Sequence, residues 1–175
     1  MGSHNEITSK NRAFEFQLDL IKQELQTLQT TIDKFDDLTQ KCKNWTILLW
    51  GSAVILALGG KEQTDFKGGF IFTVIIPLLF WILDAWWRRN QRMFIFRMSL
   101  ISEFLNGPAY LTSFERSQIV GLKLFDLKAN DIAVKNEREK FSSLRRTLLF
   151  KSVVIFYGGL ILFSMFLQLY LGNKK

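Results

Sequence analysis

The sequence predicts an all-α membrane protein with three transmembrane helices, an N-terminal cytoplasmic coiled-coil helix and a symmetric homo-oligomeric state. Three observations lead to this fold class. Three apolar stretches approach the length that crosses a bilayer, a heptad repeat precedes the first of them, and no β-strand pattern occurs in the 175 residues. The composition agrees, because 48% of the residues are hydrophobic while the net charge is +7. A large soluble core around three such helices is the less favoured alternative.

The chain offers little of what an enzyme needs. Residues 1–4, MGSH, resemble the remnant of an expression tag and are set aside, which leaves no histidine as a general base or metal ligand. Cys42 is the single cysteine and excludes an internal disulfide or a site with several cysteine ligands. Glycine-rich phosphate loops and a G-x-S-x-G turn do not occur. We therefore predict no catalytic residue, no metal and no cofactor.

Residues 5–44 are predicted to form the coiled-coil helix. Between residues 14 and 42, apolar side chains alternate at spacings of three and four, as in a coiled coil. The predicted oligomerisation residues are Leu18, Leu25 and Ile32 at a and Phe14, Ile21, Leu28 and Phe35 at d. Cys42 takes the next d position as a small core residue. Two interpretations stay open: the stripe joins copies of the chain, or it packs one amphipathic helix onto its own chain.

The first span covers residues 45–60 and begins a transmembrane hairpin that extends to residue 87. No Pro or Gly occurs between residues 36 and 50, so the helix is expected to continue from the coiled coil into the membrane. The extended register places Thr46 and Ala53 at a, and Leu49 and Leu56 at d. On a symmetry axis these four residues would line a pore. Such a ring forms either a sealed bundle or a hydrophobic constriction that gates by dewetting.

The second span covers residues 70–87 and contains Pro77 and Asp84. An intramembrane carboxylate is by default a candidate functional group. Asp84, however, lies one turn before Arg88 and within a turn of the expected membrane edge. We therefore favour a structural ion pair between these two residues over an ion-relay site.

Residues 88–150 are predicted to form a basic, helical cytoplasmic region. "NGP" at residues 106–108 is expected to end the helix that leaves the second span. "TSFE" at residues 112–115 fits a capping box for a short helix through Ile119, Leu122 and Phe125. From Asp131 a long helix is expected to run unbroken into the third span, residues 151–172.

Charge predicts the direction of the spans. Residues 88–151 hold 13 Lys or Arg against 6 Asp or Glu, whereas residues 1–44 hold 6 against 7. Lys and Arg concentrate on the cytoplasmic side of membrane proteins. The basic region and the N-terminus are therefore expected in the cytoplasm, and the C-terminus outside.

The basic residues have three candidate roles: they set the topology, they bind anionic lipid headgroups, or they bind a nucleotide or oligonucleotide through their phosphates. The candidate anion-binding residues are Arg88, Arg89, Arg92, Arg97, Lys135, Arg138, Lys140, Arg145 and Arg146. Repeated around a ring, the two groups would line one electropositive cavity.

The stretch "FWILDAWWRRNQRMFIFR" at residues 80–97 resembles a pattern in small bacterial membrane proteins, in which F-W-x-L-D-A precedes two aromatic residues and an arginine-rich helix. "QLDLIKQEL" at residues 17–25, the tryptophan that begins the first span and the short polar hairpin are also similar. The resemblance covers about residues 14–105 and is to the Hailong-type channel effectors of anti-phage defence loci. It implies a bacterial inner-membrane channel regulated by the nucleotide product of a partner nucleotidyltransferase.

The expected function is thus an oligomeric channel, with a tetramer favoured, that an anionic regulator gates and that depolarises the membrane when open. The alternative is a non-conducting scaffold or sensor that recruits a partner through its cytoplasmic helices. Membrane lipids are expected contacts in both cases. The ion, the regulator and the direction of its effect do not follow from the sequence.

Overall fold

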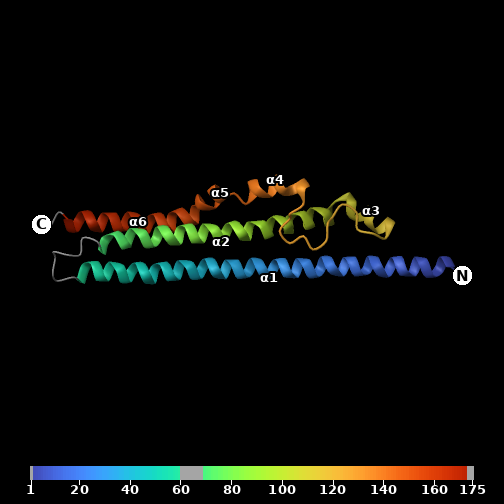
Figure 1. Ribbon diagram of the computed structural model, residues 1–175, viewed down its shortest axis with the longest axis horizontal. Helices are drawn as coiled ribbons and strands as arrows, with labels where there is room; N and C mark the ends of the chain where they lie inside the picture. The colour runs from blue at the N-terminus through green and yellow to red at the C-terminus, as the bar shows by residue number, and fades with distance from the viewer. Residues whose placement is uncertain (1, 60–68, 173–175) are drawn as a thin grey trace. The chain divides into compact units, whose positions relative to one another are not determined.

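The computed structural model describes residues 2–59 and 69–172, and it is helical throughout most of this range (Figure 1). The helices are α1 (Gly2–Gly59), α2 (Gly69–Asn106), α3 (Pro108–Arg116), α4 (Ile132–Phe141), α5 (Leu144–Leu148) and α6 (Lys151–Gly172). The described residues contain no strand, and the predicted all-α fold is confirmed.

Two expected helix continuations are confirmed. The helix α1 runs without a break through residues 36–50, where neither Pro nor Gly occurs. The helix α2 runs from its apolar part through the arginine-rich stretch and ends at Asn106. Pro77 lies inside α2 and is buried. A helix in apolar surroundings tolerates such a proline when neighbouring helices surround the freed backbone group.

"NGP" separates α2 from α3, as the sequence predicts. Gly107 has extended backbone angles, donates its N–H to the carbonyl of Phe104 at 3.1 Å and accepts the N–H of Tyr110 at 3.2 Å. Pro108 occupies the first turn of α3. There its fixed φ suits a helix and its missing N–H would have had no partner in the helix.

Gly107→Ala is expected to destabilise the protein by about 1–3 kcal/mol, as overpacking does. A Cβ atom at this position would lie 2.9 Å from the carbonyl oxygen of Glu103, a backbone atom of the last turn of α2. Gly51→Ala is the matched control, because a Cβ there meets no atom within 4 Å. Denaturation of the detergent-solubilised protein, followed by circular dichroism, compares the two. Equal stability of both variants would contradict the steric argument.

The predicted short helix through Ile119, Leu122 and Phe125 is wrong. The helix in this region begins earlier, at Pro108, and ends at Arg116. Ser117 then takes a left-handed conformation, with φ of 50°, and its N–H closes the helix on the carbonyl of Phe114 at 3.2 Å. Residues 117–131 follow as an irregular segment, which we call the strap.

The predicted unbroken helix from Asp131 into the third span is also wrong, because the chain breaks after α4 and again after α5. At the first break the hydroxyl and the N–H of Ser142 both donate to the carbonyl of Arg138, at 2.8 Å each. Ser143 then adopts extended angles. Serine side chains compete with helical hydrogen bonds in this way.

The described helices form two compact units. Unit 1 comprises the chain up to Lys34 together with Gln91–Ser142, and unit 2 comprises Phe35–Asn90 and the chain from Ser143 onward. Each unit therefore combines segments that are distant in sequence. Both α1 and α2 contribute to each unit.

The core of unit 1 joins α1 to α2. Ile21 and Leu28 of α1 are buried against Ile101 and Phe104 of α2. Phe14 is also buried, and its ring contacts that of Phe114 at 5.0 Å. Three d positions of the heptad are thus covered by their own chain, which is the second of the two interpretations of the repeat. The remaining predicted oligomerisation residues, Leu18, Leu25, Ile32 and Phe35, are half-buried.

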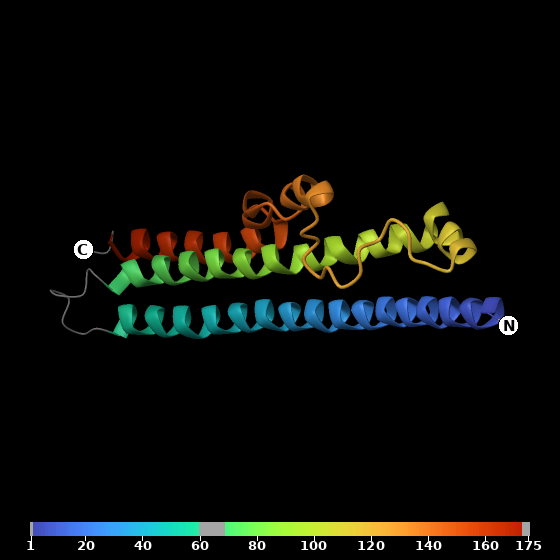
Figure 2. The same ribbon diagram turned by 45° about the vertical axis from the view of Figure 1, so that its right-hand side comes forward.

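Unit 2 contains three helical segments that lie side by side: the C-terminal part of α1, the N-terminal part of α2, and α6 (Figure 2). The indole N–H of Trp50 in α1 donates to the Ser164 hydroxyl of α6 at 2.9 Å. That hydroxyl lies 3.0 Å from the carbonyl of Thr73 in α2 and can donate to it. One small polar side chain therefore ties the three segments together.

Two helices are long and apolar enough to cross a membrane. One qualifying stretch is Phe70–Asn106 in α2, and the other is Val134–Tyr170, whose apolar part is α6. They correspond to the second and third predicted spans.

Candidate functional site

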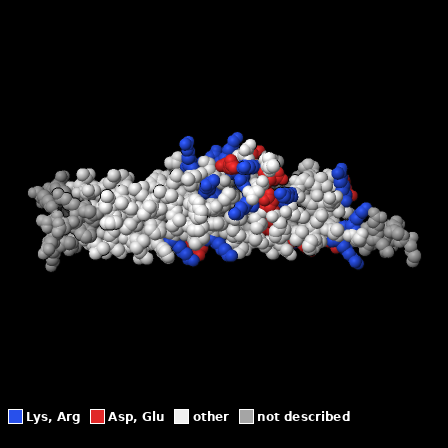
Figure 3. All heavy atoms as spheres, in the orientation of Figure 1, with Lys and Arg blue, Asp and Glu red and all other residues white. Residues whose placement is uncertain are grey.

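Unit 2 exposes a continuous apolar surface. Residues 44–59, 69–83 and 152–172 contain no Asp, Glu, Lys or Arg, and Figure 3 shows α6 and the start of α2 without charged atoms on the face in view. Large side chains are exposed on each of the three segments, for example Leu48 and Ile55 on α1, Ile71 and Leu79 on α2, and Leu162 and Phe166 on α6. A surface of this size and composition suits lipid or other helices as its surroundings.

The four predicted pore residues do not share one environment. Leu49 and Leu56 are 49% and 66% exposed on the surface of α1, and Ala53 is half-buried. Thr46 is fully buried inside unit 2, where its hydroxyl donates to the carbonyl of Cys42 at 2.7 Å. This placement does not fit a side chain that lines an axis between copies. Thr46 is therefore not a candidate pore residue, whereas Leu49, Ala53 and Leu56 remain candidates.

Asp84 is fully buried in unit 2 and forms the expected ion pair. Its Oδ1 accepts the Nε–H of Arg88 at 3.2 Å, and the guanidinium of Arg88 also lies over the Phe150 ring, 5.9 Å from its centre. The second oxygen, Oδ2, has no hydrogen-bond partner among the described residues, and neither does the buried Tyr157 hydroxyl. The one-turn spacing predicts the pair, but it contains no signal for the electrostatic interaction between Asp84 and Tyr157 of α6.

Cys42 lies in α1 just before the apolar part of the helix, with a buried side chain. Burial, and secondarily the negative charge of Asp84, raises the pKa of this thiol above its usual value. The reactive form of cysteine is the thiolate. The structure thus keeps Cys42 in its unreactive form, in line with its prediction as a packing residue.

Unit 1 contains a buried ion pair between Glu24 of α1 and Arg97 of α2. The Nε and Nη2 atoms of Arg97 lie 2.7 and 3.1 Å from the two carboxylate oxygens of Glu24. Both side chains are at most 3% exposed. The strap completes the group, because Glu24 accepts the N–H of Phe125 at 2.8 Å and Arg97 donates to the carbonyl of Lys123.

Arg97 is therefore neutralised within its own unit. Its guanidinium is not available to bind a phosphate, contrary to its predicted role. In the sequence, Glu24 lies between two apolar positions of the heptad, Ile21 and Leu25. A charged residue at the edge of such a stripe is ordinarily solvated, so its partner could not be identified from the pattern.

Two further candidate anion-binding residues have structural contacts in unit 1. Arg138 donates to the carbonyl of Lys128 at 3.0 Å and to the side chain of Asn130, and so fixes the end of the strap. The guanidinium of Arg92 lies over the Phe141 ring, 4.5 Å from its centre. Both groups stabilise the packing of α4 and of the strap.

The exposed members of the predicted anion-binding set are Arg89, Arg145 and Arg146 in unit 2 and Lys135 and Lys140 in unit 1. Unit 1 has an open hollow of about 430 Å³ whose charged lining residues are Arg97, Lys123, Glu103, Asp126 and Asp131. Carboxylates outnumber cations there. Of the nine predicted residues only Arg97 lines it, so this hollow is not the expected electropositive cavity.

Comparisons with protein-family models, with curated proteins and with solved structures found no match to this chain.

Proposed function

We propose that the chain is a three-span membrane protein, in which residues 45–60 of α1 cross the bilayer together with α2 and α6. The observation that supports this most directly is the uncharged surface that all three segments of unit 2 expose. The contact of Trp50 with Ser164, and of Ser164 with Thr73, requires the three segments to lie at the same depth. A bilayer that holds α2 and α6 therefore holds this part of α1.

The orientation follows from charge. α1 and α6 run in one direction and α2 runs in the other (Figure 1). The 13 basic residues between 88 and 151 place the cytoplasm at the end where α2 leaves the apolar surface and α6 enters it. The N-terminal part of α1 is then also cytoplasmic. We assign the protein to the inner membrane of a bacterium on the basis of its resemblance to the Hailong-type effectors.

The proposed activity is ion conduction by a homo-oligomer, with a tetramer favoured. Leu49 and Leu56 point out of the protomer and are available to meet their copies at a symmetry axis. Ala53 lies between them in sequence and allows close approach of the helices. A ring of two leucine layers forms a hydrophobic constriction, which stays closed while it is dry.

The proposed regulator is an anionic nucleotide, the product of a partner nucleotidyltransferase. Lys135 and Lys140, exposed on α4, are the members of the predicted anion-binding set in unit 1 that remain for it, because Arg97, Arg138 and Arg92 have partners or ring contacts of their own. Regulator binding sets the open fraction, and opening depolarises the membrane. This is the effector role that the resemblance in residues 14–105 implies.

Leu49→Ser and Leu56→Ser are each expected to make the channel leak, because a hydroxyl wets the constriction. Purified protein in planar bilayers should show a basal conductance at least several-fold above wild type, and cells should lose membrane potential and growth. Leu162→Ser is the matched control, because Leu162 is about as exposed as Leu56 but lies on α6. Wild-type currents in both α1 variants would contradict the pore assignment. Absence of current from the wild-type protein with every nucleotide tested would favour the scaffold alternative.

A further inference from the structure

The entry into α6 has a feature that the proposed channel does not use. Residues 143–151 comprise Ser143, the short helix α5, the break at residues 149–150 and Lys151, the first residue of α6, and we call them the α5–α6 turn. A simple span would be one straight helix, and the turn interrupts that helix. It also belongs wholly to unit 2, so its position relative to α2 is defined.

Two contacts hold the α5–α6 turn against the part of α2 that leaves the apolar surface. The indole N–H of Trp81 donates to the carbonyl of Leu148 at 3.0 Å. The Arg88 guanidinium lies over the Phe150 ring. Trp81 and Arg88 are two turns apart in α2, and the first lies in the uncharged stretch while the second lies just past it. The turn is thus placed at the edge of the apolar surface.

The backbone of the turn suits a water-poor environment. The N–H groups of Leu149 and Phe150 bond to the carbonyls of Arg145 and Thr147, at 3.2 and 3.3 Å. The hydroxyl of Thr147, which is buried, donates to the carbonyl of Leu144 at 2.8 Å. A break in a helix next to the hydrocarbon region benefits from such internal partners, because acyl chains supply none.

The exposed side chains of the turn are either cationic or apolar. Arg145, Arg146 and Lys151 are exposed, and none of them forms an ion pair in the part of the chain that the structure describes. Leu149 and Phe150 are exposed between them, although their size favours burial. No Asp or Glu occurs between residues 143 and 172. Cations beside exposed large apolar groups are typical of segments that lie in the headgroup region of a bilayer.

We infer that the α5–α6 turn binds the phosphate of an anionic phospholipid. Arg145, Arg146 and Lys151 contact the headgroup phosphate, and Leu149 and Phe150 extend beside the acyl chains. The charge and the apolar groups are complementary to that one partner, since a soluble nucleotide would leave Leu149 and Phe150 in water. The inference rests on the proposed membrane insertion of unit 2 and goes beyond it by assigning a lipid class to a defined turn.

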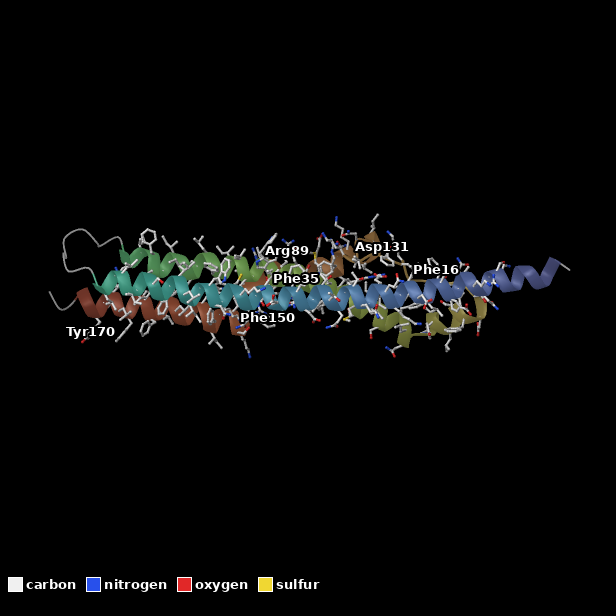
Figure 4. All side chains as sticks on the ribbon, turned by 90° about the horizontal axis from the view of Figure 1, so that it is seen from below. Phe16, Phe35, Arg89, Asp131, Phe150 and Tyr170 are labelled. Carbon is white, nitrogen blue, oxygen red and sulfur yellow. The ribbon has the colours of Figure 1, made fainter. Side chains whose placement is uncertain are left out.

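Arg89 is not part of this surface. Figure 4 shows Arg89 and Phe150 on opposite sides of the chain, which separates Arg89 from the α5–α6 turn. The lipid site is therefore carried by one short segment and can be removed without changing the arginine-rich part of α2.

The test compares lipid retention by native mass spectrometry of the full-length protein in detergent, with equimolar phosphatidylglycerol and phosphatidylcholine of the same acyl chains. The wild type should retain phosphatidylglycerol preferentially. Each cation near an anionic surface contributes a factor of about five, so R145Q/R146Q should lower this preference about 25-fold. K123Q/K128Q removes two exposed cations of the strap instead and should leave the preference unchanged.

Two further measurements identify the cause of a failure. Equal retention of both lipids by the wild type, or equal losses in the two double variants, would overturn the lipid site. Displacement of phosphatidylglycerol by excess inorganic phosphate would also overturn it and would indicate a soluble anion site. Alkaline carbonate extraction of native membranes tests the underlying proposal separately: release of the wild type would contradict membrane insertion, whereas retention without lipid preference would contradict only this inference.

Discussion

Arg97→Ala is expected to lower the free energy of unfolding by about 3–5 kcal/mol, the cost of breaking a buried ion pair from one side. The carboxylate of Glu24 would then remain fully buried, with the Phe125 N–H as its remaining hydrogen-bond donor among the described residues. The carbonyl of Lys123 would also lose its donor. Because the pair connects α1, α2 and the strap, the loss should open the strap to proteolysis before the rest of the chain.

The measurement is equilibrium denaturation in detergent, combined with limited proteolysis between residues 117 and 131. The double variant Glu24→Met/Arg97→Met should recover most of the lost stability, because two apolar side chains leave no uncompensated charge. Lys22→Ala serves as the control, since Lys22 pairs with Asp19 on the exposed side of the same helix. A double variant as unstable as the single one would show that the cost comes from packing and not from charge.

Arg88→Met and Asp84→Asn should have unequal effects, although they remove the two halves of one ion pair. Arg88→Met leaves a carboxylate that is fully buried, and the expected cost is again about 3–5 kcal/mol. Asp84→Asn keeps an oxygen acceptor for the guanidinium, whose side chain is 18% exposed and can extend toward water. Its expected cost is about 1–2 kcal/mol.

Equilibrium unfolding in mixed micelles measures the loss in free energy of unfolding for each single variant. The double variant Asp84→Asn/Arg88→Met completes the double-mutant cycle. The cost of Arg88→Met should fall once Asp84 is replaced, because the buried charge is then gone. Lys43 lies within electrostatic range of Asp84 and partly compensates for a lost Arg88. Arg88→Met should therefore cost more in a Lys43→Met background. Equal costs for the two single changes would indicate that Asp84 reaches water more easily than its burial implies.

The helices themselves could be predicted from local sequence patterns. Apolar runs without charge, the absence of Pro and Gly before Gly51 and the "NGP" stop each act within a few residues. The pairing of Asp84 with Arg88 could also be predicted, because both lie on one helix. The exception among local features is the break after α4, where Ser142 bonds to the carbonyl of Arg138 and ends a helix that the sequence predicts as continuous.

The predictions failed where partners come from distant residues. The capping-box pattern at residues 112–115 lies inside α3, and the helix predicted to follow it is replaced by the strap, in which the N–H groups of Ile119 and Phe125 bond to Gln17 and Glu24 of α1. No local pattern contains those bonds. For the same reason the predicted anion-binding roles of Arg97 and Arg138 are wrong. An arginine is available to a phosphate only if its guanidinium is not already bonded to a carboxylate or carbonyl of its own chain. The apolar periodicity of residues 14–42 predicts a buried helix face, but periodicity is the same whether the partner helix is another copy or the same chain.

The bonds between α1 and the strap also constrain how the protein is made. Gln17 and Glu24 meet their partners, Ile119 and Phe125, about one hundred residues later in the chain. During synthesis, Glu24 remains without its later partners while the apolar segments at 45–60 and 70–87 are being made. Contacts so distant in sequence form late. Unit 1 can therefore close only after residues 45–87 have been made, so that nascent chains stalled before residue 125 would carry an open, protease-sensitive α1.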